Sequence, residues 1–134
     1  VKEIISYIHE HYYEDIKLKE VADFCNYSPS HFMRFFKEHL HTSFTKYLND
    51  YRLIQTKKLL SESDLSILEV AGRCGFNNIS YFNRLFKQKY NLTPRELRGW
   101  NKISNIDWKT HCKIEVFSNT LNNVFSVFLI FYVL

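Results

Sequence analysis

The chain has 134 residues with a net charge of +4, of which 46% are apolar and 17% aromatic, enough for one domain with its own core. It contains only three glycines and two prolines, which favours helices joined by few tight turns and excludes a glycine-rich phosphate-binding loop. Residues 1–32 carry three Lys or Arg against six Asp or Glu, whereas residues 33–100 carry twelve against six, a balance that suits a polyanionic partner or a solvated surface.

The first hundred residues predict seven helices and no strand. Apolar residues at helical spacing mark the first two helices, over residues 2–13 and from Leu18 to about Asn26. Ser28 followed by Pro29 predicts the start of the third helix. Serine supplies the side-chain acceptor of an N-cap, and proline is tolerated at the first helical position.

The fourth predicted helix, residues 43–61, is the longest, and its apolar face extends to Ile54 and Leu59. Ser66 and Glu69 then form an S-x-x-E capping box, which predicts the start of a fifth helix.

Two further helices complete this part of the chain. Gly75 supplies a turn, and the stretch SYFNRLFKQKY that follows predicts the sixth helix. A second capping box, from Thr93 to Glu96, opens a short final helix over residues 94–99.

The sequence repeats itself at an offset of 49 to 50 residues. SHFMRFFK at residues 30–37 matches SYFNRLFK at residues 80–87, and E-V-A-x-x-C precedes both stretches. Each half is a short helix, a turn and a longer helix, which is the helix-turn-helix unit. The sequence therefore predicts an all-α fold in which a long central helix joins two helix-turn-helix subdomains, residues 18–41 and 66–90.

The polar part of the repeat points to DNA. Core packing explains the repeated phenylalanines, but not Arg34 with Arg84 or Lys37 with Lys87, because a helix buries only one stripe. The central helix, at about 1.5 Å per residue, spans roughly 28 Å. Successive major grooves on one face of DNA lie about 34 Å apart, so such a helix suits a spacer between two reading helices.

These stretches resemble the DNA-binding domain of AraC/XylS-type bacterial transcription regulators. The resemblance is carried by SPSHFMRFFKEHLHTSFTKYLNDYRLIQTKKLL and ILEVAGRCGFNNISYFNRLFKQKYNLTPRELR, and it covers about residues 1–99. It implies that residues 1–100 form a domain with two recognition helices in successive major grooves. It also implies sequence-specific binding to double-stranded promoter or operator DNA and regulation of transcription.

Twelve side chains are predicted to contact DNA, and the resemblance assigns all of them except Lys37 and Lys87, which lie one turn further along each helix. In the first recognition helix these are Ser30, His31, Met33, Arg34 and Lys37. In the second they are Asn78, Ile79, Ser80, Tyr81, Asn83, Arg84 and Lys87. Arginine can hydrogen-bond guanine with two donors, asparagine can pair with adenine, and Met and Ile can contact a thymine methyl group. The two lysines are better placed for phosphates, which fix register without reading sequence.

The chain departs from the family pattern at two places. Lys17 stands where many members have Ser or Thr, which predicts a weakly capped second helix. The pattern also normally ends close to Arg98, whereas this chain continues to Leu134. The family further implies a sensing or dimerisation domain, expected upstream of Val1, and RNA polymerase as a second partner.

Residues 101–134 form an apolar tail for which the sequence predicts no definite structure. Its stretch VFSVFLIFYVL has eleven residues, whereas a membrane helix needs about 20, so no membrane span is expected. Three interpretations remain open: a strand or helix packed on the domain, a peripheral or partner-binding segment, and an extension from an altered reading frame.

The alternative function is a helical protein-interaction module that docks through Tyr81, Met33 and the tail without binding DNA. No catalytic grouping of Ser, His, Cys or carboxylates stands out, so no enzyme is predicted. The three cysteines are odd in number and lack paired spacing. They predict reduced thiols in a cytoplasmic protein, with no metal and no cofactor.

Overall fold

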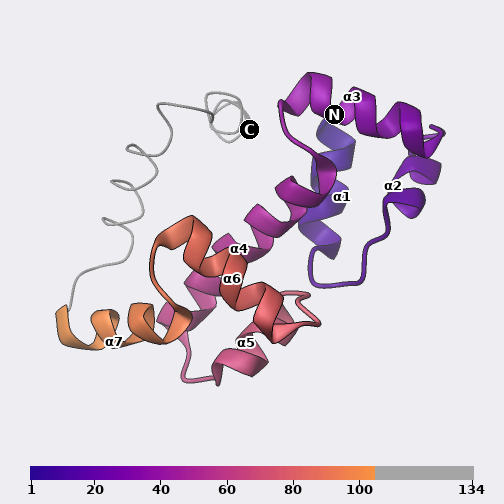
Figure 1. The fold of residues 1–134 in the computed structure, drawn as a ribbon. Helices are drawn as coiled ribbons and strands as arrows, with labels where there is room; N and C mark the ends of the chain where they lie inside the picture. Colours follow the sequence, from indigo (N-terminus) through magenta and orange to yellow (C-terminus); the bar gives the residue numbers. More distant parts are fainter. Residues whose placement is uncertain (105–134) are drawn as a thin grey trace. The chain divides into compact units, whose positions relative to one another are not determined.

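A computed structural model describes residues 1–104, and over these residues the chain forms seven α-helices and no strand (Figure 1). The helices are α1 (Lys2–His11), α2 (Leu18–Phe24), α3 (Pro29–Leu40), α4 (Phe44–Glu62), α5 (Ile67–Arg73), α6 (Ile79–Tyr90) and α7 (Pro94–Ser104). The predicted all-α fold is confirmed. None of these helices is long and apolar enough to cross a bilayer.

The final helix is longer than expected. It was predicted to end near Gly99, but α7 continues to Ser104. The reason is that Gly99 does not adopt the positive φ with which a glycine usually ends a helix. The remainder of the predicted tail, residues 105–134, lies outside the described part of the chain.

Most of the helices begin after a polar N-cap residue, at the positions that the sequence predicted. Ser28, Ser43 and Ser66 accept hydrogen bonds from backbone N–H groups three residues later, at 3.2–3.3 Å. Asn78 does the same for α6, at 2.9 Å. Each cap satisfies an N–H group that would otherwise have no partner in the first turn.

The start of α2 lacks such a cap. Lys17 occupies the N-cap position without a side-chain hydrogen bond, and only half of a capping box remains, in which the Lys17 N–H donates to the Glu20 carboxylate at 3.2 Å. A positive side chain at this end also opposes the helix dipole. The expectation of a weak start is confirmed.

Lys17→Ser is therefore expected to raise the free energy of unfolding by about 0.5–1 kcal/mol, because serine would supply the missing acceptor. Urea denaturation followed by circular dichroism measures the change. Ser66 holds the equivalent position in the second repeat, so Ser66→Ala is the matched control and should lower stability by about 1 kcal/mol. A Lys17→Ser protein no more stable than the wild type would show that the half box suffices.

The repeat extends to the backbone of the turns. Asn26 and Gly75, 49 residues apart, both have positive φ, at 56° and 89°. His41 and Asn91, 50 residues apart, end α3 and α6 with φ values of 53° and 57°. The two helix-turn-helix units thus share their left-handed turn and their helix end as well as their apolar pattern.

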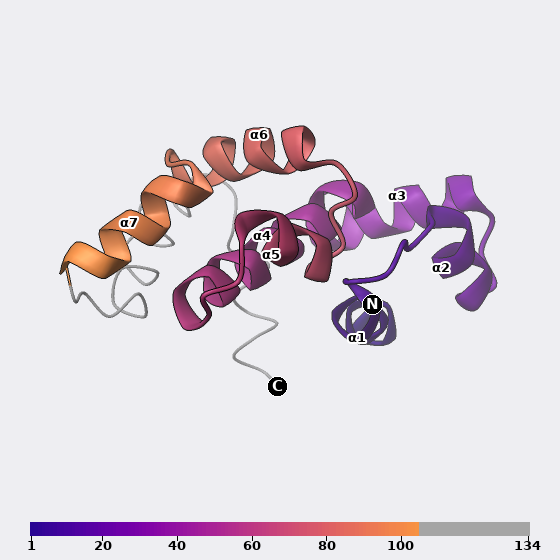
Figure 2. The ribbon, with the colours of Figure 1, turned by 90° about the horizontal axis from the view of Figure 1, so that it is seen from below.

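The central helix α4 contributes side chains to two separate hydrophobic cores, which lie on opposite sides of it. Helices α1–α3 gather around its first half and α5 and α6 around its second half (Figures 1 and 2). The first half buries Phe44, Tyr47 and Leu48, and the second half buries Leu53, Thr56, Lys57 and Leu60. The second set repeats the first with a shift of nine residues, which at 3.6 residues per turn is half a rotation about the helix axis.

This change of side corrects one expectation. Ile54 was placed on a single continuous apolar face, but its side chain is 46% exposed. The buried face has already rotated by that point, so Leu53 packs into the second core in its place.

Aromatic side chains fill much of both cores. Phe32 and Phe36 of α3 lie 5.6 and 5.8 Å from the ring of Phe44. In the second core, the ring centroids of Phe82 and Phe86 of α6 lie 5.6 Å apart, close to the 5.7 Å between Phe32 and Phe36. All four of these α3 and α6 rings are at most 1% exposed. Each longer helix of a repeat is therefore held along one stripe, which leaves its other faces to solvent.

Candidate nucleic-acid interface

Helices α3 and α6 each present an exposed surface opposite their buried phenylalanines. Of the twelve side chains assigned to DNA contact, eleven are exposed. They are Ser30, His31, Met33, Arg34 and Lys37 on α3, and Asn78, Ser80, Tyr81, Asn83, Arg84 and Lys87 at the start and along α6. The structure thus gathers them into two surfaces, one in each helix-turn-helix unit.

Ile79 is the exception among the twelve. Its side chain is only partly exposed and packs against the second core. Asn78 is exposed, but its Oδ1 accepts the N–H of Tyr81 as the cap of α6. Its amide nitrogen keeps two donors. These two residues start the helix, and their structural roles leave less of each side chain for a ligand.

The α6 surface is organised around Tyr81. Its hydroxyl oxygen accepts a hydrogen bond of 3.0 Å from the side-chain amide of Asn49 in α4. The guanidinium carbon of Arg84 lies 5.2 Å from the centre of the Tyr81 ring, a cation–π arrangement. The hydrogen bond from Asn49 restrains the Tyr81 ring, and the cation–π contact with that ring restrains the Arg84 side chain before any ligand binds.

An open hollow lies beside the C-terminal half of α6. It is lined by Asn83, Arg84, Lys87, Gln88 and Thr93. The walls of this hollow are mostly the apolar parts of these side chains, and among them Lys87 carries the charge suited to a phosphate. Gln88 and Thr93 were not among the predicted site residues.

The α3 surface has a different character. The ring of His31 packs edge-to-face on Tyr27, with centroids 4.4 Å apart, and Met33 is 49% exposed. Arg34 and Lys37 supply the positive charge. This surface offers an apolar contact together with cationic donors, whereas α6 offers more amide and hydroxyl groups.

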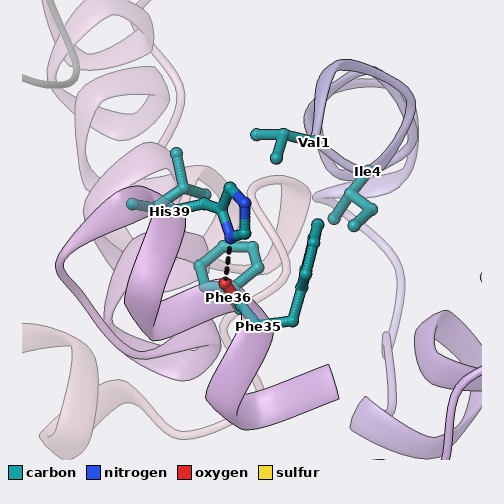
Figure 3. Close-up of a pocket in the computed structure, with 6 residues that line it drawn as sticks. Val1, Ile4, Phe35, Phe36 and His39 are labelled. Atoms are coloured by element: carbon teal, nitrogen blue, oxygen red, sulfur yellow. Dashed lines mark hydrogen bonds between the residues drawn. The ribbon is translucent and has the colours of Figure 1, made fainter. Parts of the chain in front are cut away.

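A second hollow, between α1 and α3, is apolar (Figure 3). It is lined by Val1, Ile4, Phe35, Phe36, His39 and Leu40. The Nδ1–H of His39 donates to the carbonyl oxygen of Phe35 at 2.8 Å, so this nitrogen is already used within α3. A ligand site normally adds convergent polar groups to an apolar lining, and this hollow offers little of that kind.

Burial affects both thiols within residues 1–104. Cys25 and Cys74 are both free. Burial raises the pKa of Cys74 to about 11 and also raises the pKa of Cys25, so both stay protonated near neutral pH. In the same part of the chain, no three His, Cys, Asp or Glu side chains group closely enough to bind a metal ion.

Comparison with known proteins identifies relatives among helix-turn-helix transcription regulators. A family model described as "Helix-turn-helix domain" matches residues 21–99. The chain is 35% identical over 98 residues to "Regulatory protein PocR" of Salmonella typhimurium, and 34% identical over 98 residues to "HTH-type transcriptional activator RhaS" of Salmonella schwarzengrund. Each match covers 73% of this chain but only 32% and 35% of the relatives, so the chain spans about a third of their length.

Solved structures are similar over the same region. The DNA-binding domain of AdpA in complex with a target DNA matches with a TM-score of 0.74 and 26% identity, over 79% of this chain and 96% of that one. An AraC-type transcriptional regulator from Chromobacterium violaceum matches with a TM-score of 0.69 and 27% identity, over 77% of this chain and 92% of that one. The chain belongs to the AraC/XylS family of helix-turn-helix transcription regulators.

Proposed function

We propose that residues 1–100 bind double-stranded DNA with α3 and α6 in successive major grooves on one face of the duplex, and that this regulates transcription in the bacterial cytoplasm without catalysis. The observation that carries the proposal is the pair of exposed polar surfaces on equivalent helices of two repeated units.

The side chains have distinct roles in this proposal. Arg34, Asn83 and Arg84 read base edges, because their donors match guanine or adenine in the major groove. Met33 makes an apolar contact. Lys37 and Lys87 bind phosphates, and Gln88 and Thr93 extend the phosphate contact of α6.

The relatives are longer than this chain, and this difference bears on what else the full protein contains. The curated relatives are about three times as long as the matched region. We infer that a sensing or dimerisation domain accompanies this one in the full protein, and that RNA polymerase is a second partner of the DNA-bound regulator.

Selection from a random duplex library, followed by hydroxyl-radical footprinting, tests the proposal. The expected footprint protects two stretches of backbone about one helical turn apart on one face of the duplex. Affinity should also fall with salt at a logarithmic slope of about −0.9 per phosphate contacted. Failure to select any duplex would support a protein-interaction module instead.

A further inference from the structure

Arg52 is a buried arginine at the point where α4 changes its buried side. Its side chain is 9% exposed, and along the sequence of α4 it comes between Leu48 of the first core and Leu53 of the second. Its Nε–H donates to the carbonyl oxygen of Tyr12 and an Nη2–H donates to that of Glu14, both at 2.7 Å. Both acceptors belong to the segment that joins α1 to α2.

The other side of the same guanidinium faces the turn of the second helix-turn-helix unit. Arg52 Cζ lies 5.9 Å from the centre of the Phe76 ring. A Cβ atom built on Gly75 would lie 2.9 Å from Arg52 Nε and 2.7 Å from the carbonyl oxygen of Tyr12. One side chain of α4 therefore contacts the first subdomain and the turn of the second.

The contacts of Arg52 restrain the relative positions of the groups that they join. The planar guanidinium fixes the direction of both donors, and hydrogen bonds from a charged donor are stronger than neutral ones. Burial lowers the pKa of Arg52, because desolvation disfavours the cation, and the nearby carboxylate of Asp15 opposes this effect. Without the arginine, the Tyr12 carbonyl would lose its hydrogen bond from Nε–H, whereas the Glu14 carbonyl would keep the one that it accepts from the Ile16 N–H at 2.9 Å.

We propose that Arg52 fixes the angle between the two helix-turn-helix units and thereby sets the spacing of DNA half-sites that the domain accepts. The inference rests on the proposed function. Besides helix α4, the units meet where Tyr12 packs against the second core and its carbonyl oxygen lies beside Gly75. The arginine donates to that same carbonyl oxygen and so stabilises this connection away from the helix axis. Because B-DNA turns by roughly 34–36° per base pair, moving one half-site by one base pair changes the required angle by that amount.

Spacing variants of a selected duplex test the proposal. The probe is the duplex that the wild-type protein selects from a random library, with one or two base pairs inserted or deleted between its half-sites. Wild-type affinity should fall about tenfold for each step, which is the usual size of a single mismatch. For Arg52→Met the fall should be less than about threefold, with affinity for a duplex carrying one intact half-site changed by less than about twofold.

Lys57→Met is the matched control. Lys57 lies in the same helix and is 5% exposed, but its Nζ lies 4.6 Å from the centre of the Tyr90 ring in the second subdomain. The substitution removes the same charge and should leave the spacing profile as narrow as in the wild type. Arg52→Lys keeps the charge but lacks the rigid fork of donors, and its profile should be intermediate.

The outcomes separate the two hypotheses. If wild-type protein selects no duplex, the proposed function fails and this inference fails with it. If it selects one and Arg52→Met keeps the wild-type spacing profile, or if the wild type accepts all spacings alike, Arg52 has no role in spacing. Should Arg52→Met not fold, the Arg52→Lys profile decides, and a profile identical to that of the wild type would overturn the inference.

Discussion

Gly75→Ala is expected to lower the free energy of unfolding by about 2–4 kcal/mol. Gly75 has a φ of 89°, where a side chain is strained. The added Cβ would also lie 2.7 Å from the carbonyl oxygen of Tyr12 and 2.9 Å from Arg52 Nε. Both neighbours are held by hydrogen bonds to each other, so neither moves at low cost.

The first repeat offers a matched control for this prediction. Asn26 is exposed and adopts the same left-handed conformation, with a φ of 56°. Asn26→Ala should cost about 1 kcal/mol, since it introduces only the backbone strain. Urea denaturation of both variants measures the difference. Equal losses would mean that the close approach at Gly75 adds nothing to the strain.

Rules that apply to neighbouring residues predicted most of the fold, because a short stretch of sequence specifies each helix start. Ser28-Pro29 and the box from Ser66 to Glu69 each specify a helix start from side chains that lie within one turn. The end of α7 was missed because a glycine ends a helix only when its φ is positive, and the sequence alone does not fix φ at Gly99.

Tertiary features were harder to predict. The face of α4 that includes Ile54 looked continuous because periodicity was counted along one helix, whereas the two cores lie on opposite sides of it. The sequence did not single out Arg52 either. Its partners are the backbone carbonyls of Tyr12 and Glu14, about 40 residues away, and such contacts leave no local pattern.

The candidate interface was predictable to the extent that it follows the repeat. The repeat identified the exposed positions of α3 and α6 because equivalent helices bury equivalent stripes. It could not identify Asn49, which lies in α4 and reaches α6 only through the fold. Thr93 was noticed as a cap, yet its place beside Lys87 depends on how the chain turns after α6.

Arg84→Ala is expected to weaken binding to the selected duplex by about 1–3 kcal/mol and to relax specificity at one base pair. Arg84 packs on the Tyr81 ring, which itself accepts a hydrogen bond from Asn49, so its donors are held before DNA arrives. Less conformational freedom is then lost on binding. Titration against the selected duplex and its single-base variants measures the effect at each position.

Lys87→Ala is the control on the same helix, one turn further on. It also removes one positive charge, but a phosphate contact carries no sequence information, so binding to every duplex should weaken by a similar factor. The logarithmic salt slope should become shallower by about 0.9. Arg84 has a reading role only if its loss is concentrated at one base pair while the loss for Lys87 is spread evenly. A uniform loss for both variants would reduce Arg84 to a phosphate contact and leave base reading on α6 to Asn83.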